Sequence, residues 1–286
     1  MFNLSFSSNK APYKVGVALS GGGARGFAHV GALQAMEDMG LRPDILAGVS
    51  AGSIVATLYA TGLKPEEILE CFSAVSFTDF ARLGVASGGL FKMDGFKKFM
   101  LQHLKHSRLE DLPIPTVIGA TDLDRCVPVK FETGDIAERV MASCCMPIIF
   151  KPIKIDGVSY VDGGVLHNLP AWAIKDKCKY LIGINCSPMS ISRGRNHTLI
   201  DVAMRAYTMM AKSNAIVDMD ICDLAVSVDS VARYKVFDLR EIKRVYSNGY
   251  HAMMEALVAN GFKRPEDVAR REDSMFRRLR KIWKSK

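Results

Sequence analysis

The fold of this chain is indicated by the segment Ile45-Leu46-Ala47-Gly48-Val49-Ser50-Ala51-Gly52-Ser53-Ile54-Val55-Ala56-Thr57-Leu58. Its start is apolar and typical of a buried strand, whereas residues 53–58 are small and apolar and predict a helix. A serine at such a sharp turn is held above the sheet with its hydroxyl exposed, and the helix N-terminus beside it favours developing negative charge. The flanking Gly48 and Gly52 fit this prediction, because side chains would crowd the strained turn. Ser50 is therefore a candidate nucleophile.

Strand and helix patterns alternate on both sides of this turn. Strands are predicted at 13–20, 45–49, 116–121, 127–131, 180–185 and 224–228, with a hairpin at 154–161 around Asp156-Gly157. Helices are predicted at 27–39, 53–58, from 65 onward, and at 93–104, 136–143, 198–217 and 238–258. The alternation predicts an α/β fold, a three-layer sandwich in which helices cover both faces of a mostly parallel central sheet.

Composition favours one large domain followed by a basic tail. The chain has 286 residues, of which 49% are hydrophobic, so it can bury a substantial core. We expect one α/β domain at 10–262 and a separate tail at 263–286. The tail has ten Lys or Arg and four Asp or Glu, which supply most of the net charge of +8. The N-terminus does not resemble a signal peptide, and no apolar run of about 18 residues predicts a membrane span. The seven scattered cysteines indicate reduced thiols and a cytoplasmic protein.

A glycine loop follows the first predicted strand. Gly21, Gly23 and Gly26 satisfy the Gly-x-Gly-x-x-Gly pattern at the start of a helix. The loop amides could bind the pyrophosphate of a dinucleotide, with Asp44 on the ribose, or they could form an oxyanion hole. A tight turn without a ligand is the third interpretation. Ser50 separates the first two, because a nicotinamide enzyme needs no serine on a nucleophile turn.

A serine nucleophile needs a base, and the sequence offers an aspartate rather than a histidine. None of the six histidines stands in a glycine-flanked turn; they are His29, His103, His106, His167, His197 and His251. An aspartate does stand in such a turn, Asp162-Gly163-Gly164, directly after the apolar segment 158–161. An ordinary Asp-Gly turn is the alternative interpretation of these residues.

These elements, in this order, resemble the patatin-like phospholipases, a family related to cytosolic phospholipase A2 and the neuropathy target esterase domain. The resemblance rests on Gly21-Gly22-Gly23-Ala24-Arg25-Gly26, Gly48 to Gly52, Ala142-Ser143-Cys144-Cys145-Met146-Pro147, Asp162-Gly163-Gly164 and Asn168-Leu169-Pro170. It runs from about residue 14 to 170, and more weakly to about 258. It implies the patatin-like form of the predicted α/β sandwich.

The resemblance also implies a mechanism. Ser50 and Asp162 would form a catalytic dyad without histidine, supported by Gly163 and Gly164. The loop from Gly21 to Gly26 would form the oxyanion hole, through amides around Gly22, Gly23 and Ala24, with Arg25 nearby. We expect no metal, because no Asp, Glu and His residues have the spacing of metal ligands and the dyad requires none, and we expect no cofactor. The chain departs from the commoner pattern at His167, which we expect to be structural or to face the substrate rather than to act as the base.

The C-terminal tail has apolar residues at helical spacing between basic ones. They are Met275, Phe276, Leu279, Ile282 and Trp283. This amphipathic pattern predicts a helix that packs on the domain, lies on an anionic membrane surface, or contacts nucleic acid. The third option lacks a recognition motif, so we expect no nucleic-acid partner.

The sequence therefore predicts a serine acyl hydrolase acting on esters of phospholipids or lysophospholipids. A soluble carboxylesterase or thioesterase for smaller acyl groups is the alternative enzyme. A dinucleotide-binding protein using Gly21, Gly23, Gly26 and Asp44, and a non-catalytic adaptor, are alternatives from other classes. We expect a cytoplasmic location, with residues 263–286 as a candidate peripheral contact on the inner face of the membrane. A homo-oligomer is left open.

Overall fold

The computed structural model describes residues 11–73, 82–83, 91–188 and 198–263. Its central sheet has the strand order β10-β9-β1-β2-β5-β8-β7, and β6 also pairs with β5. Neighbouring strands from β10 to β5 are parallel, whereas β6, β7 and β8 are antiparallel to their partners. The bounds are β1 (Tyr13–Leu19), β2 (Ile45–Val49), β5 (Thr116–Asp122), β6 (Val127–Phe131), β7 (Ile153–Ile155), β8 (Val158–Asp162), β9 (Cys178–Asn185) and β10 (Leu224–Ser227). The mostly parallel sheet is confirmed. A separate antiparallel pair joins β3 (Arg82–Leu83) to β4 (Phe91–Lys92).

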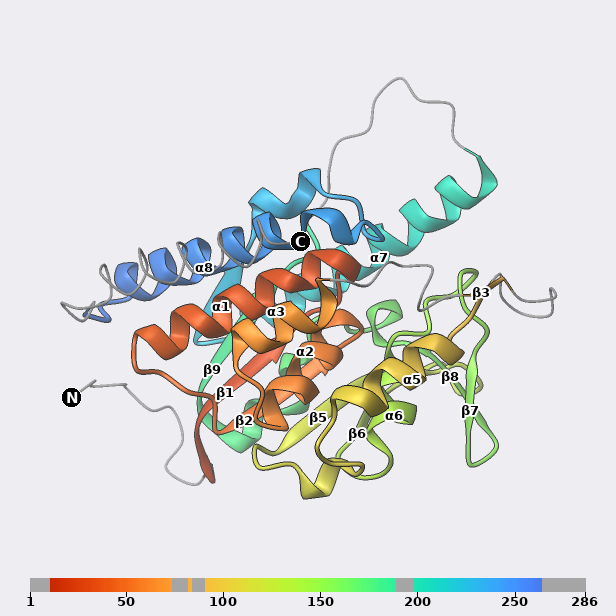
Figure 1. Ribbon diagram of the computed structural model, residues 1–286, viewed down its shortest axis with the longest axis horizontal. Helices are drawn as coiled ribbons and strands as arrows, with labels where there is room; N and C mark the ends of the chain where they lie inside the picture. The colour runs from red at the N-terminus through yellow and green to blue at the C-terminus, as the bar shows by residue number, and fades with distance from the viewer. Residues whose placement is uncertain (1–10, 74–81, 84–90, 189–197, 264–286) are drawn as a thin grey trace.

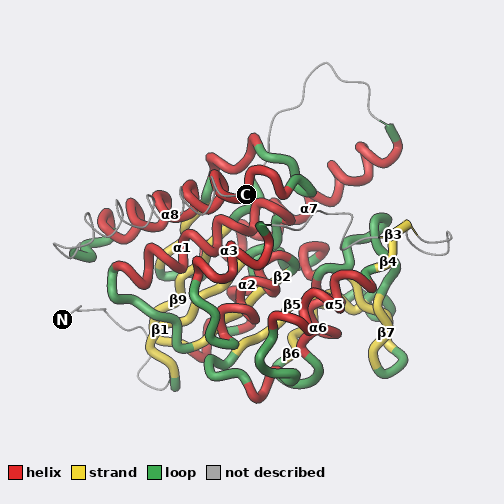
Figure 2. Tube along the Cα trace, in the orientation of Figure 1, coloured by secondary structure: helices red, strands yellow, loops and turns green. Residues whose placement is uncertain are grey.

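Helices lie on both sides of this sheet, as Figures 1 and 2 show. Their bounds are α1 (Phe27–Asp38), α2 (Ala51–Ala60), α3 (Pro65–Phe72), α5 (Asp94–His103), α6 (Ile136–Ser143), α7 (Leu199–Asp220) and α8 (Ile242–Ala259). Several predicted bounds differ from the observed ones; the helix predicted at 53–58, for example, spans Ala51–Ala60. The last helix begins only at Ile242, because Leu239–Glu241 form a 3-10 turn, and α7 continues past residue 217 to Asp220.

The two faces of the sheet bury different partners. On β1, the side chains of Val15, Val17 and Leu19 belong to the larger core, together with residues of α1, α3 and α8. Ala18 points to the other face, where the smaller core includes Leu169 and a residue of α7. Because side chains alternate along a strand, this division gives three layers. The expected sandwich is therefore confirmed.

The register of β5 brings two distant strand ends together. Val49, the last residue of β2, pairs with Gly119, while Asp162, the last residue of β8, pairs with Ala120. Since β6 occupies the other edge of β5 over 118–122, β2 and β8 must share one edge and meet end to end. The residues that follow Val49 therefore lie beside Asp162, although the two strands are far apart in sequence.

Candidate active site

Ser50 occupies the sharp turn between β2 and α2. Its φ of 52° and ψ of −124° lie in a region that costs an L-residue about 1–3 kcal/mol. The turn is held by Ser143, whose hydroxyl accepts a hydrogen bond from the Ser50 amide at 2.8 Å and donates one to the Gly119 carbonyl at 2.6 Å. A Cβ on Gly52 would collide with the Leu19 carbonyl, so the flanking glycine is required by close approach. The surrounding structure thus holds a strained serine at the end of the sheet.

Asp162 is fully buried at the end of β8. Its Oδ1 accepts a hydrogen bond from the Gly164 amide at 2.8 Å, whereas Oδ2 has no hydrogen-bond partner among the described residues. Burial raises the pKa of this carboxyl from 3.8 to about 6, against the opposing effects of the Gly164 amide and the nearby hydroxyls of Ser50 and Tyr207. A carboxyl with a pKa near neutrality is a usable general base. The hydrogen bond between a nucleophile and its base is often long in a structure without substrate.

The glycine loop offers fewer free amides than expected. The Gly21 amide donates to the Asn168 carbonyl at 3.0 Å, and the Ala24 amide donates to the Val236 carbonyl at 2.7 Å. These two amides are therefore occupied, which corrects the inclusion of Gly21 and Ala24 in the oxyanion hole. The amides of Gly22 and Gly23 have no hydrogen bond in the described part of the chain. Both glycines line a cavity that Ser50 also lines, so they are the remaining candidate donors.

Arg25 lines the same cavity, but backbone carbonyls occupy its guanidinium. Its guanidinium is buried and donates to the carbonyls of Tyr234, Pro188 and Ala232 at 2.8, 3.0 and 3.1 Å. Arg25 thus lies beside the candidate oxyanion hole, where its three hydrogen bonds give it a structural role. The side chain fastens residues 232–236 over the glycine loop, next to the bond that Val236 accepts from Ala24.

An apolar cavity of about 120 Å³ opens at Ser50. It extends between the glycine loop and α2, α3 and α5, and the segment held by Arg25 contributes one wall. Its larger lining side chains are Phe27, Ile54, Val55, Phe72, Met93, Phe96, Met146, Phe150, Val236, Phe237 and Leu239. A hydrocarbon chain is the ligand that such a lining can bind.

A second, smaller cavity of about 30 Å³ lies beside Ser50 and carries most of the polar groups. Asn168, Ser187, Tyr207 and Thr208 contribute to it. Tyr207 was not predicted from the sequence as a site residue. The sequence signal for a role at the site was weak, because Tyr207 lies in a long helix, where a tyrosine at helical spacing indicates packing.

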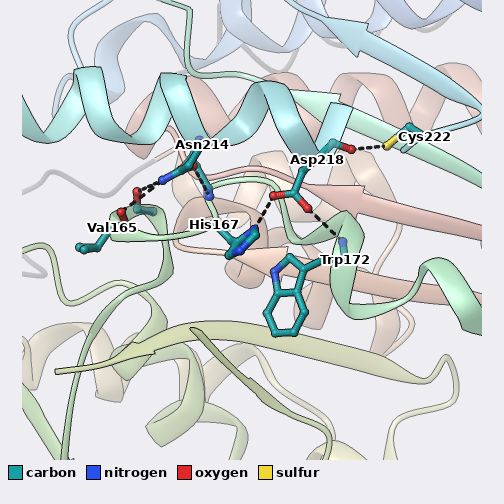
Figure 3. A network of polar contacts seen from close by, with 8 residues as sticks. Val165, His167, Trp172, Asn214, Asp218 and Cys222 are labelled. Atoms are coloured by element: carbon teal, nitrogen blue, oxygen red, sulfur yellow. Dashed lines mark hydrogen bonds and ion pairs between the residues drawn. The ribbon is translucent and has the colours of Figure 1, made fainter. Parts of the chain in front are cut away.

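His167 is paired with an acid on α7. Its Nδ1 lies 2.7 Å from Oδ2 of Asp218, and its ring lies 5.3 Å from that of Trp172. Figure 3 shows Asn214 and Asp218 of α7 pointing toward the segment that follows Asp162. Asp218 also accepts a hydrogen bond from the Trp172 amide at 3.0 Å. This His–Asp pair joins α7 to the loop, and His167 lines neither cavity at Ser50.

Asp44 lies away from the glycine loop. One of its carboxylate oxygens accepts the amides of Lys14 and Val15 at 2.9 and 2.8 Å, at the first residues of β1. The glycine loop follows the last residue of β1, so a strand of seven residues, roughly 20 Å, separates the two. Asp44 therefore cannot serve a nucleotide bound at the loop, and the dinucleotide interpretation loses its acidic residue.

Several expectations fall wholly or partly outside the described residues. They include the basic tail from residue 264 onward. Two segments whose sequences predict loops that shape the pocket, 77–92 and 188–197, also lie mostly outside the described residues. The boundary between domain and tail stays a prediction. Within the described ranges, no group of three or more His, Cys, Asp or Glu is placed to bind a metal ion, and no helix has the length and hydropathy to cross a membrane.

Comparison with known proteins identifies the family. A family model described as patatin-like phospholipase matches residues 17–174, more than half of the chain. The protein belongs to the patatin-like phospholipase family. This patatin-like chain is 31% identical over 160 residues to an uncharacterised NTE family protein of Mycobacterium tuberculosis, a match covering 55% of this chain and 44% of the relative.

Two further relatives extend this comparison. Lysophospholipase NTE1 of Cryptococcus neoformans is 29% identical over 177 residues, which cover 57% of this patatin-like chain but 10% of the fungal protein. The chain thus matches less than half the length of the mycobacterial protein and of the fungal protein. Among solved structures, VipD from Legionella pneumophila superposes with a TM-score of 0.57 over 86% of this chain and 67% of VipD, at 14% identity. That likeness concerns the fold alone.

Proposed function

We propose that this patatin-like protein is a serine acyl hydrolase that cleaves carboxylic esters of phospholipids or lysophospholipids. The observation that carries the proposal is the apolar cavity that opens at Ser50, because it offers an acyl chain a site next to a strained serine. Membership of the family and the name of the fungal relative, a lysophospholipase, support the same substrate class.

In the proposed reaction, Ser50 Oγ attacks the ester carbonyl carbon and its proton passes to Asp162. The amides of Gly22 and Gly23 donate to the oxyanion that develops on the carbonyl oxygen. The bond to the leaving alcohol then breaks, the alcohol takes the proton from Asp162, and the acyl group remains on Ser50. Water hydrolyses this ester in a second, analogous step.

A fluorophosphonate probe tests the activated serine. We expect one adduct, on Ser50, by intact mass and peptide mapping, and loss of labelling in Ser50→Ala and Asp162→Asn. His167→Ala is the matched control, because His167 is paired with Asp218 and should keep most of the esterase activity. Full activity in Ser50→Ala would contradict the mechanism, and loss of activity in His167→Ala with retention in Asp162→Asn would replace the dyad by a triad.

Substrate class needs a second assay. Phospholipids and lysophospholipids with long acyl chains should be cleaved faster than short-chain esters or thioesters, because long chains bury more apolar surface in the cavity. A preference for short soluble esters would favour the carboxylesterase alternative.

We also propose a peripheral membrane contact through residues 263–286, where basic residues predominate. Co-sedimentation with vesicles containing anionic lipid should decrease in a chain that ends at Gly261. Equal binding by both chains would contradict this part of the proposal.

A further inference from the structure

Two buried polar atoms next to Ser50 lack hydrogen-bond partners among the described residues. They are Oδ2 of Asp162, an acceptor when the carboxyl is ionised, and Nδ2 of Asn168, a donor. Their residues are 0% and 1% exposed. Buried polar groups are nearly always hydrogen-bonded to protein or water, so a complementary pair of this kind indicates a small polar ligand.

The side chains of both residues converge on one point with Tyr207. A Cβ built on Gly164 would lie 2.9 Å from Oδ1 of Asn168 and 3.2 Å from Oδ1 of Asp162, and it would collide with the Tyr207 hydroxyl. Asn168 and Tyr207 also line the 30 Å³ cavity that Ser50 shares. That cavity has room for about two water molecules, and it shares only Gly23, Ser50, Met146 and Val236 with the lining of the apolar cavity.

We propose that Asn168 and Tyr207 position the water molecule that hydrolyses the acyl-Ser50 intermediate. The water accepts one hydrogen bond from Nδ2 of Asn168 and one from the Tyr207 hydroxyl, and it donates one to Oδ2 of Asp162. The inference rests on the proposed function, since it concerns the second half of that reaction.

The chemical step balances within the site. The water oxygen bonds to the acyl carbonyl carbon while Asp162 takes one water proton. The bond from that carbon to Ser50 Oγ then breaks, Oγ takes the proton from Asp162, and the free carboxylic acid leaves. No other reactant is required.

The backbone around Asn168 is fixed independently of its side chain. The Asn168 amide donates to the Asn214 side chain at 2.8 Å, and its carbonyl accepts the Gly21 amide at 3.0 Å. Asn214 also donates to the Gly164 carbonyl at 3.0 Å. Asn168→Ala therefore removes the donor to water while leaving the loop held by α7.

Pre-steady-state hydrolysis of a chromogenic long-chain ester tests the proposal. Asn168→Ala and Tyr207→Phe should slow deacylation at least about tenfold while acylation changes little, because only the second step uses the water. Both variants should then show a burst of chromophore and an acyl adduct on Ser50 by intact mass. Tyr207→Phe keeps the proposal testable if Asn168→Ala folds poorly.

Matched controls exist in the same chain. Nδ2 of Asn248 is also buried without a partner in the described residues, but Asn248 lies on α8 and lines neither cavity. Tyr13 is a half-buried tyrosine at the start of β1. Asn248→Ala and Tyr13→Phe should give no burst.

Two results would overturn the inference. Slower acylation without an acyl adduct would mean that the small cavity serves the leaving alcohol, and unchanged kinetics in both variants would mean that it serves neither step. Failure of the proposed function looks different, since the wild-type protein would then show no fluorophosphonate adduct on Ser50.

Discussion

Replacing Asp162 by asparagine should stabilise the fold at neutral pH while removing activity. Burial raises the pKa of Asp162 from 3.8 to about 6, so the folded state resists its ionisation. Below pH 3.8 the carboxyl is protonated in both the folded and unfolded states and costs nothing. Between pH 3.8 and pH 6 the carboxyl ionises in the unfolded chain before it ionises in the folded protein. Above pH 6 its burial lowers the free energy of unfolding by the full amount, about 3 kcal/mol. An asparagine keeps the acceptor for the Gly164 amide and carries no charge.

Urea unfolding of both proteins at two pH values measures this effect. At pH 7.5 the free energy of unfolding should be about 3 kcal/mol higher for Asp162→Asn, and at pH 4.5 the advantage should shrink to about 1 kcal/mol. Asp44→Asn is the control, because the exposed Asp44 carboxylate accepts two backbone amides and its loss should not stabilise the protein. An advantage for Asp162→Asn that is absent, or that does not change with pH, would refute the assignment of a penalised buried carboxylate.

Three further predictions concern activity and packing. The value of kcat/KM should fall about tenfold per pH unit below pH 6, where Asp162 becomes protonated, and a flat profile from pH 5 to 8 would exclude it as the base. Val55→Trp should fill the apolar cavity, so that a screen of ester chain lengths shows a larger loss for long acyl chains than for acetate esters. Arg25→Met removes three hydrogen bonds to backbone carbonyls and should lower the free energy of unfolding by about 3 kcal/mol in urea titrations; an unchanged midpoint would show that residues 232–236 need no such support.

Local sequence patterns predicted the elements that carry the site. The turn at Ser50 follows from an apolar strand, two glycines and a small-residue helix within fourteen residues, because strand and helix periodicity are local properties. The glycine loop and the Asp162 turn were found in the same way. Helix ends were less well predicted, as at Leu239–Glu241, because a 3-10 turn and an α-helix share the same composition.

The sequence of the glycine loop could not predict which of its amides lack a hydrogen bond in the folded protein. The Ala24 amide and the Arg25 guanidinium are occupied by carbonyls of residues 188 and 232–236, which lie more than 150 positions later in the chain. Such pairings depend on how separate segments pack, and a pattern within one segment holds no information about them.

The serine turn, the glycine loop and the α/β order of elements follow from local sequence, since each depends on neighbours along the chain. The meeting of β2 and β8 on one edge of β5, which places Ser50 near Asp162, is visible only in the folded chain. It also brought Tyr207 of α7 to the same carboxyl. These proximities come from strand register and helix packing, which burial and hydrogen bonding fix only when the whole chain has folded.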